Sequence, residues 1–318
     1  MALIFLVASL PKFFENMNNK LINWLIFSVL SIIWGSSFIL MKLGLYEDND
    51  MSKPILTAYQ VASLRIIFSA IVLLPIAIKH FKSLNSKTVF IIFLSGLQGS
   101  LVPAYLFCIA ETKIDGALAG SLNALTPVFV ILMGSFFFNL KVSKNKILGI
   151  CVSFVGSILL FFAQPTFAQN PNIFYTFLVV LATLMYGINV NMVGKYLTNI
   201  PSLHIAAIAL VLNAIPALVV LYFTGYFSQN VFTHSMLTAT GFTFILGVFG
   251  TALASVIFYM LMKRAGYVFA SMVTYAIPTV AVGWGIFYGE KIGWKQIVCL
   301  AIILCGVYIA NRVQRDDA

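Results

Sequence analysis

The residues that could bind a solute are polar side chains set inside long apolar runs, where such groups are costly and mark functional sites by default. Thr251, Ser255 and Tyr259 follow one another at spacings of four, which places them on one helical face. Gln98 and Tyr105 are seven residues apart and are expected to share a face in the same way. The pattern predicts a pathway with an uncharged polar lining and aromatic walls, suited to a small amphipathic molecule. Its predicted members are Trp34, Ser37, Gln98, Tyr105, Asn123, Tyr186, Asn189, Thr251, Ser255, Tyr259, Thr274 and Tyr275.

Two explanations remain open for these groups. Hydrogen bonds between helices, and anchoring of Tyr and Trp at the membrane interface, account for any single member. The set as a whole favours a pathway. Arg65 is the one Asp, Glu, Lys or Arg deep within an apolar run. It either attracts a carboxylate or phosphate of a solute or has a structural role, bonded to helix-end carbonyls or reaching an interface. The sequence alone favours the structural role.

Two prolines occur at matching places in similar apolar segments, Pro127 in 117–138 and Pro278 in 268–289. Proline lacks an N–H and displaces the carbonyl four residues earlier, which belongs to Asn123 in one segment and Thr274 in the other. In a lipid core a freed backbone group needs a partner or a wet cavity. The prolines are therefore predicted to be helix flex points beside a central pathway. Local satisfaction of the backbone by Asn123 or Thr274 is the alternative.

Motifs for other chemistry are missing from the sequence. It contains no GxxxxGK[ST] for ATP hydrolysis, no HExxH and no GxSxG, and its histidines and cysteines form no metal-ligand pattern. We therefore expect no catalytic residue, no metal and no cofactor, and a protein that is not an enzyme. No deep Asp or Glu offers a proton carrier, so facilitated diffusion or exchange is at least as plausible as proton coupling.

The elements that must position these residues are membrane-spanning helices. The chain is 61% hydrophobic and 9% charged, with a mean hydropathy of +1.01, far from the values of soluble domains. Residues 147–194 and 196–262 contain no Asp, Glu, Lys or Arg. At about 20 residues per crossing, the sequence predicts an all-α polytopic protein with ten transmembrane helices. The predicted spans are 21–42, 55–78, 88–110, 115–138, 146–163, 172–194, 202–223, 235–262, 267–288 and 295–311.

An internal repeat relates the two halves of the chain. A shift of 151 residues aligns Gly99 with Gly250 and Pro127 with Pro278, and SIIWGSSF (31–38) resembles TLMYGINV (183–190). Because each half has five spans, an odd number, the halves are predicted to be inverted-topology repeats, an arrangement of secondary transporters with sites near the midplane. On the fifth and tenth spans, Gly149, Ser153 and Gly156 and then Ala301, Cys305 and Tyr308 are predicted packing faces.

The net charge of +10 is distributed as a topology signal. With the N-terminus inside, thirteen Lys and Arg fall inside and five outside, with Arg65 in a span. The positive-inside rule then places both termini in the cytoplasm. The predicted partners are the lipid bilayer and a small-molecule substrate; no nucleic acid and no ATPase subunit is implied, and the oligomeric state is left open.

Four segments are predicted: a cytoplasmic tail at 1–20, a first repeat at 21–163, a second at 164–312, and a short cytoplasmic tail at 313–318. Residues 1–16, MALIFLVASLPKFFEN, contain an apolar run too short to span and no preceding basic residue. We expect them to be an interfacial tail or the result of an upstream start codon.

These residues together resemble the EamA-type branch of the drug/metabolite transporter superfamily. The resemblance is carried by WGSSF after an apolar span, Arg65 in the second span, SLNALTPVFVILMGSFFF, and the stretch from ASMVTYAIPTVAVGWGIFYGEKIGW to the end of the tenth span. It implies ten helices around a central cavity lined mainly by spans one, three, four, six, eight and nine. It also implies ATP-independent transport of small metabolites, often export of amino acids or related compounds.

One departure from the pattern concerns Glu290. The first repeat has Asn139-Leu140 where the second has Gly289-Glu290, so Glu290 is expected to be a gating or structural residue. The sequence thus predicts an exporter of small metabolites in a bacterial inner membrane. The alternatives are a carrier of sugar derivatives or phosphorylated metabolites, and, from a different class, an integral membrane enzyme.

Overall fold

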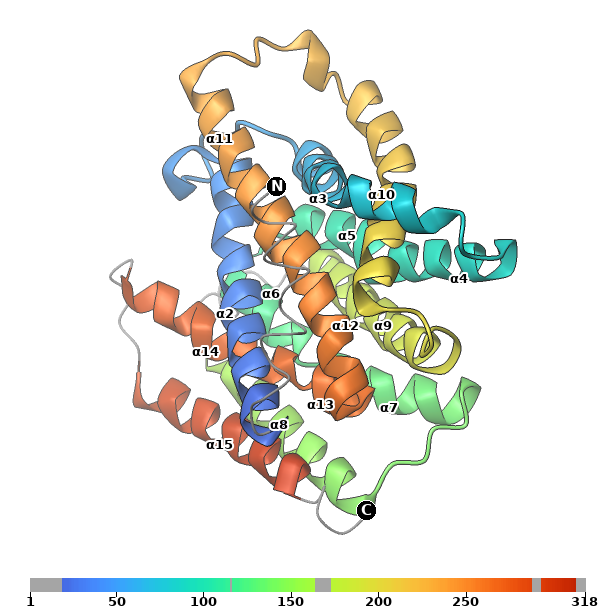
Figure 1. Ribbon diagram of the computed structural model, residues 1–318. Helices are drawn as coiled ribbons and strands as arrows, with labels where there is room; N and C mark the ends of the chain where they lie inside the picture. Colours follow the sequence, from blue (N-terminus) through green and yellow to red (C-terminus); the bar gives the residue numbers. More distant parts are fainter. Residues whose placement is uncertain (1–18, 115, 164–172, 288–292, 313–318) are drawn as a thin grey trace.

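The computed structural model describes residues 19–114, 116–163, 173–287 and 293–312, and regular secondary structure in them is helical (Figure 1). Residues 1–18 of the predicted tail at 1–20 lie outside the described residues, as do the predicted tail at 313–318 and Glu290. The α-helices are α2 (Asn19–Leu45), α3 (Ala58–Phe81), α4 (Ser86–Gly96), α5 (Val102–Ala110), α6 (Gly116–Asn123), α7 (Thr126–Phe137), α8 (Lys144–Phe162), α9 (Ile173–Tyr196), α10 (Ser202–Phe223), α11 (His234–Ile245), α12 (Ala254–Ala265), α13 (Tyr267–Ser271), α14 (Val273–Phe287) and α15 (Trp294–Arg312).

Eight helical stretches in the described part of the chain are long and apolar enough to cross a membrane. They are Lys20–Leu45, Ala58–Phe81, Ser86–Ala110, Leu118–Phe137, Ile173–Tyr196, Ser202–Phe223, His234–Ala265 and Tyr267–Trp284. The predicted spans 146–163 and 295–311 correspond to α8 and α15, of 19 residues each. The all-helical, multi-pass class is therefore confirmed, while ten crossings and the four-segment division stay predictions.

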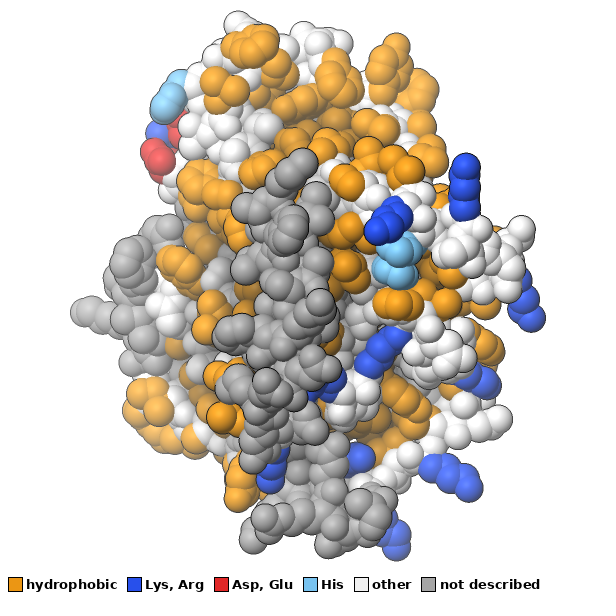
Figure 2. Space-filling view, in the orientation of Figure 1, with side chains coloured by type: hydrophobic (Ala, Val, Ile, Leu, Met, Phe, Trp, Pro, Cys, Tyr) orange, Lys and Arg blue, Asp and Glu red, His pale blue; other side chains and the backbone are white. Residues whose placement is uncertain are grey.

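The described surface is that of a protein in contact with lipid. Large apolar side chains point outward on many helices, for example Phe136 at 76% exposure and Phe223 at 80%. Figure 2 shows hydrophobic side chains over much of one face, with most Lys and Arg in its right and lower parts and acidic side chains beside a basic one at its upper left edge. Outward-facing apolar groups of this kind are stable in a hydrocarbon environment, where they have no water to avoid.

Helix α3, which carries Arg65, has a firmly defined start. Thr57 and Gln60 form a capping box: Gln60 N–H donates to Thr57 Oγ1 at 3.2 Å, and Thr57 N–H donates to Gln60 Oε1 at 3.0 Å. The Gln60 amide also donates to the carbonyl of Thr224, just after α10, at 3.1 Å. Helices α3 and α10 pack along each other. Arg65 is thus held about 10 Å along the axis from the start of its helix.

Two helical stretches contain π-helical segments, at Leu97–Leu101 between α4 and α5 and at Leu246–Leu253 between α11 and α12. The wider turn has i→i+5 bonding and often occurs at functional sites. The Thr251 hydroxyl follows the same register and donates to the carbonyl of Leu246 at 3.4 Å. A shift of 151 residues brings the first segment inside the second, as the repeat predicts.

The two proline-bearing segments are broken helices. The first divides between Asn123 and Thr126, and Pro127 then lies in the first turn of α7, where its missing N–H costs nothing. The second divides at Met272, and Pro278 lies inside α14. Pro127 is therefore not the centre of a kinked helix, because the break precedes it. The proposed role of both prolines as flex points stays a prediction.

Helices α8 and α15 form a close pair (Figure 1). Ser153 donates its hydroxyl to the carbonyl of Ile303 at 2.9 Å, and a Cβ on Gly149 would lie 2.5 Å from that of Ala310. The predicted face on α8 is confirmed. The predicted face on α15 is wrong: Ala301, Cys305 and Tyr308 are exposed, because the contacts fall on the face that carries Ile303, Gly306 and Ala310.

Candidate substrate-binding cavity

A cavity of about 100 Å³ lies at the centre of the bundle, where helices from both predicted repeats meet. Its walls come from α2, α3, α5, α6, α7, α9, α12, α13 and α14 and from both π-helical segments. The lining residues are Trp34, Ser37, Phe38, Met41, Arg65, Gly99, Ser100, Ala104, Phe107, Asn123, Thr126, Tyr186, Asn189, Val190, Gly250, Thr251, Ser255, Phe258, Tyr259, Ser271, Thr274 and Ile277.

Most of the predicted pathway residues meet in this one cavity. The structure brings together Trp34, Ser37, Asn123, Tyr186, Asn189, Thr251, Ser255, Tyr259 and Thr274, and Arg65 lies with them. Gln98, Tyr105 and Tyr275 are not part of the lining. The two prolines stand just behind it on α7 and α14. These residues are thus neighbours in space, and their role in binding is the subject of the proposals below.

The three outliers have structural explanations. The π-helical segment that begins at Leu97 changes the helical phase between Gln98 and Tyr105, so seven residues no longer return to the same face. Tyr105 pairs its hydroxyl with that of Ser63 at 2.7 Å, between α5 and α3. Tyr275 is fully buried and donates to the carbonyl of Ile150 at 3.1 Å, which ties α14 to α8.

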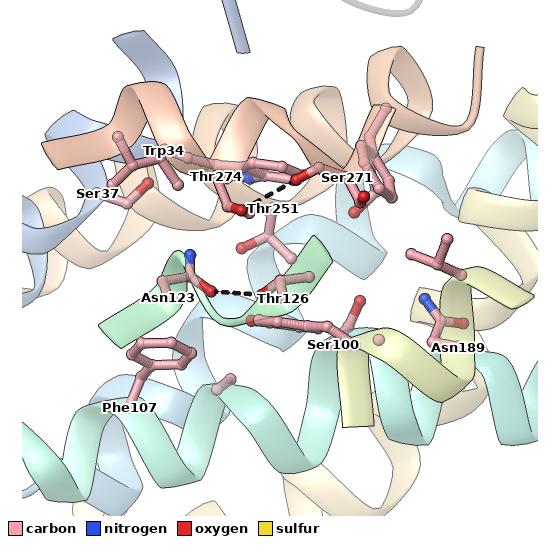
Figure 3. A pocket seen from close by; sticks show the side chains of 18 of the residues that line it. Trp34, Ser37, Ser100, Phe107, Asn123, Thr126, Asn189, Thr251, Ser271 and Thr274 are labelled. Atoms are coloured by element: carbon pink, nitrogen blue, oxygen red, sulfur yellow. Dashed lines mark hydrogen bonds between the residues drawn. The ribbon is translucent and has the colours of Figure 1, made fainter. Parts of the chain in front are cut away.

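The two helix breaks bring polar side chains to the cavity (Figure 3). At the first, the Thr126 hydroxyl donates to Asn123 Oδ1 at 3.1 Å; at the second, the Thr274 hydroxyl donates to the carbonyl of Ser271 at 2.9 Å. The hydroxyl of Thr274 therefore satisfies one backbone carbonyl at the second break, in line with the alternative explanation, whereas the bond at the first break joins two side chains. Within the described residues no partner is found for the Asn123 amide nitrogen, so its two N–H groups remain available to a ligand.

Aromatic rings form a second part of the wall. The rings of Trp34 and Phe258 lie 5.1 Å apart between centroids, and those of Phe107 and Tyr186 lie 6.1 Å apart. Phe38 contacts Phe107 edge-on at 6.0 Å. Such rings present apolar faces to a ligand.

Two close contacts at the cavity are equivalent to each other under the repeat. A Cβ on Gly250 would lie 2.7 Å from Ser37 Oγ, and a Cβ on Gly99 would lie 2.7 Å from Asn189 Cγ. Gly250 aligns with Gly99, and Ser37 with Asn189. Each π-helical segment therefore touches the first helix of the opposite half through a glycine, because only glycine leaves room for that approach.

A second pair of contacts follows the same rule. Gly35 on α2 faces Val280 on α14, and a Cβ on Gly35 would lie 2.5 Å from the Cβ of Val280. Gly187 on α9 faces Phe129 on α7, and a Cβ on Gly187 would lie 2.8 Å from the Cβ of Phe129. Gly35 aligns with Gly187, and Phe129 with Val280 under the 151-residue shift. Both contacts again cross between the halves, so the same arrangement recurs on the two sides of the cavity.

Arg65 brings a charge to an otherwise uncharged lining. Its Nε and Nη2 donate to Thr251 Oγ1 at 3.1 and 3.0 Å, and its Nη1 lies 3.6 Å from Met41 Sδ. Among the described residues that line the cavity, no other side chain is charged. Its partners are a hydroxyl, a thioether and the side chain of Cys108, not helix-end carbonyls. The choice between an anion-binding and a structural role stays a prediction.

Several lining residues were missed from the sequence. Thr126 and Ser271 stand three residues from Asn123 and Thr274, so helical spacing alone was enough to find them. Met41 follows Ser37 by four. Ser100 gave no such signal, because it reaches the cavity from within a π-helical segment.

Comparison with known proteins identifies the class of molecule that this fold and cavity define. The sequence model of the EamA-like transporter family matches residues 21–162 and again 173–312. The chain belongs to this family.

Several relatives align over almost the full length of the chain. An uncharacterized transporter of Archaeoglobus fulgidus is 24% identical, covering 91% of this chain and 98% of its own. The uncharacterized transporter YoaV of Bacillus subtilis is 23% identical, covering 88% and 93%, and protein PagO of Salmonella typhimurium is 22% identical, covering 90% and 91%. A solved crystal structure matches with a TM-score of 0.68 at 14% identity over 92% of this chain and 96% of its own, which shows the fold.

Proposed function

We propose that this protein is a secondary transporter that exports small metabolites, amino acids or related amphipathic compounds, through the central cavity. Membership in a transporter family and the helices able to cross a membrane support a multi-pass membrane transporter of small molecules. The family and its named relatives indicate a transport role and not an enzymatic one. The observation that carries the finer proposal is the cavity itself, polar inside an apolar bundle and lined from both halves.

Ten helices in two inverted five-helix repeats form the architecture of the proposal. Its support is the set of four glycine contacts between the halves. They form two pairs, and the two contacts of each pair are equivalent under the repeat. In such an architecture the two halves rock around a fixed site. Contacts between the halves are then the ones that open and close.

The proposed location is a bacterial inner membrane with both termini in the cytoplasm. The excess of Lys and Arg on one side of the predicted topology supports it, and in Figure 2 most basic side chains lie away from the acidic ones. Among substrate classes, the lining favours a compound with both polar and apolar parts. A carrier of multiply charged phosphorylated compounds would need a cluster of cations, and one arginine lines the described cavity.

The test is comparative analysis of the medium from cells that express the protein, the Asn123→Ala, Thr274→Ala double variant, or an empty vector. The variant removes two polar groups at the helix breaks. At about 1 kcal/mol per hydrogen bond, export is expected to fall roughly tenfold or more. A compound that accumulates outside only with the intact protein supports both the transport and the site.

A matched control separates the site from general loss of polarity. Ser69→Ala, Thr183→Ala removes two buried hydroxyls that bond carbonyls of their own helices and do not line the cavity. This variant is expected to export normally at equal membrane expression. Equal accumulation with intact protein and with the Asn123, Thr274 variant would reject the site, and no accumulation above the vector would reject export.

A further inference from the structure

The guanidinium group of Arg65 has unused hydrogen-bonding capacity where it meets the cavity. Of its five N–H groups, two donate to the single oxygen of Thr251 and one faces the sulfur of Met41, a weak acceptor. The side chain of Cys108 is a third partner of Arg65. All three partners are neutral, and no carboxylate is among the described lining residues. Arg65 therefore presents a charge with remaining donor capacity to a space bounded by uncharged groups.

The neighbours of the Arg65 guanidinium do not compensate the cost of removing its charge from water. Removing a charge from water costs several kcal/mol unless an opposite charge and hydrogen bonds compensate, and an arginine within a membrane span normally has such a partner or faces water. An anion that entered the cavity would supply both the charge and the acceptors. A planar carboxylate also matches the fork geometry of a guanidinium group.

We propose that Arg65 is the carboxylate-binding residue of the cavity, so that the transported molecule carries a single carboxylate that docks on its free N–H groups. This inference rests on the proposed transport function and names its substrate class. A zwitterion meets the requirement as well as a simple acid does, because its cationic end has aromatic faces nearby, those of Trp34 and Tyr186.

Thr251 is the positioning residue for this subsite. Its hydroxyl proton is directed to the carbonyl of Leu246, five residues earlier, which leaves its oxygen lone pairs to accept from Arg65. The π-helical register thus orients Thr251, and Thr251 orients the guanidinium. The backbone of Arg65 is fixed by the same segment, since a Cβ on Gly247 would lie 2.7 Å from the Arg65 carbonyl oxygen.

The surroundings favour a monoanion over a phosphate dianion. One arginine neutralises one negative charge, and the other polar lining groups are neutral, such as Ser37, Asn123 and Ser255. A second negative charge in the same space would remain uncompensated. The shared chemistry is an oxyanion, and the experiment below distinguishes the two kinds.

The first experiment needs no knowledge of the cargo. Purified full-length protein in lipid nanodiscs is treated with phenylglyoxal, and modification of Arg65 and Arg264 is followed by peptide mass spectrometry. Propionate, propionamide or methyl phosphate is added at equal concentration. We expect propionate to slow modification of Arg65 severalfold and propionamide to have no effect. Arg264, which lies at the end of α12, serves as the internal control and should react equally in every sample.

Three results of that experiment would overturn the proposal. Equal protection by the acid and its amide would remove the role of charge. Stronger protection by methyl phosphate would contradict the carboxylate assignment. Absence of any modification at Arg65, while Arg264 reacts, would show that the guanidinium is not reached from the cavity.

The second experiment compares export by the wild type, Arg65→Gln, Arg65→Lys and the matched control Arg264→Gln, at equal membrane expression. Losing a hydrogen bond to a charged group typically changes binding about tenfold or more, so export of a carboxylated cargo should fall by that factor in Arg65→Gln. Arg65→Lys should keep part of the export, and Arg264→Gln all of it. A neutral amide of the cargo should be carried equally by wild type and Arg65→Gln, which a merely structural role would not produce.

A neutral or cationic cargo that depends on Arg65 would contradict the proposal, and so would a carboxylated cargo exported normally by Arg65→Gln. If the wild type exports nothing above the vector, the proposed export function fails on its own. The protection experiment still decides whether Arg65 binds carboxylates, so the two failures are distinguishable.

Discussion

The π-helical segments Leu97–Leu101 and Leu246–Leu253 have similar backbones and different chemical surroundings. In the first, the preceding Gly96 approaches α10, with 2.9 Å from a built Cβ to the carbonyl of Ala209. In the second, Gly247 approaches α3, at 2.7 Å from the carbonyl of Arg65. Gly96 and Gly247 are aligned by the repeat. The close approach is thus common to both halves.

The polar residues beside the two contacts differ in whether they line the cavity. Asn213, on α10, donates to the carbonyls of Phe93 at 3.2 Å and Ala209 at 2.8 Å, and it does not line the cavity. Arg65, on α3, lines it. The comparison teaches that the repeat supplies the backbone twice while the charge is placed once. A cavity built in this way is electrically asymmetric and favours one orientation of a polar ligand.

The largest expected difference is between Arg65→Gln and Asn213→Ala. The first should lower transport of a carboxylated cargo about tenfold or more, since it removes a charged donor from the cavity. The second removes only structural hydrogen bonds. It should lower the free energy of unfolding by about 1 kcal/mol and leave transport per folded molecule unchanged. Uptake into proteoliposomes, normalised to folded protein, measures both. Similar transport losses in the two variants would remove the proposed asymmetry.

Thr251→Val should have an intermediate effect. The isosteric change keeps the volume but removes the acceptor for Arg65 Nε and Nη2, so the guanidinium is less well oriented while its charge remains. Affinity for the cargo should fall severalfold, less than in Arg65→Gln. The measurement is the concentration dependence of transport, where the half-saturating concentration should rise. A loss as large as that of Arg65→Gln would place Thr251 in direct contact with the cargo.

The paired glycine contacts should respond unequally to alanine. In Gly99→Ala the new methyl meets Asn189, whose Oδ1 accepts from Ser95 at 2.6 Å, so the side chain has little freedom to move. In Gly250→Ala it meets the smaller Ser37 hydroxyl, whose rotation costs one bond to the carbonyl of Ile33 in its own helix. Overpacking should lower the free energy of unfolding by about 1–3 kcal/mol in Gly99→Ala and by less in Gly250→Ala. Melting of the purified variants tests this, and a larger loss in Gly250→Ala would contradict it.

The smallest expected contrast concerns the prolines. Pro278→Ala restores an N–H inside α14 and allows a bond to the Thr274 carbonyl, which should stiffen the helix and slow transport about twofold. Pro127→Ala changes a first-turn position that needs no N–H and should have little effect. Initial transport rates of the single variants and the double variant provide the measurement. Unchanged rates in all three would reject the flex-point proposal.

The apolar runs were sufficient to locate the helices, because burial in lipid imposes long uninterrupted spans. The repeat added real spatial information, since aligned pairs such as Ser37 and Asn189 occupy matching places at the cavity. Both signals depend on hydrophobicity and register over many residues, and sequence records these well.

The local hydrogen-bond register of the helices could not be predicted from the sequence. Nothing in the apolar pattern distinguishes a π-helical turn from an α-helical one, so Gln98 and Tyr105 were wrongly expected on one face. The helix break before Pro127 was not predicted for a similar reason, because proline is compatible with a first turn as well as with a kink. The partners of Arg65 depend on how α3 and the segment around Thr251 meet, which only tertiary packing decides.

The most direct test of the central claim uses the contact between the halves at the cavity. A built Cβ at Gly250 lies 3.8 Å from that of Ser37, close to the mean spacing of about 3.8 Å in disulfides. The Ser37→Cys, Gly250→Cys variant should therefore form a cross-link on oxidation, verified by mass spectrometry. If the halves must separate to admit cargo, transport should stop in the cross-linked protein and return on reduction. Undiminished transport by fully cross-linked protein would contradict the account.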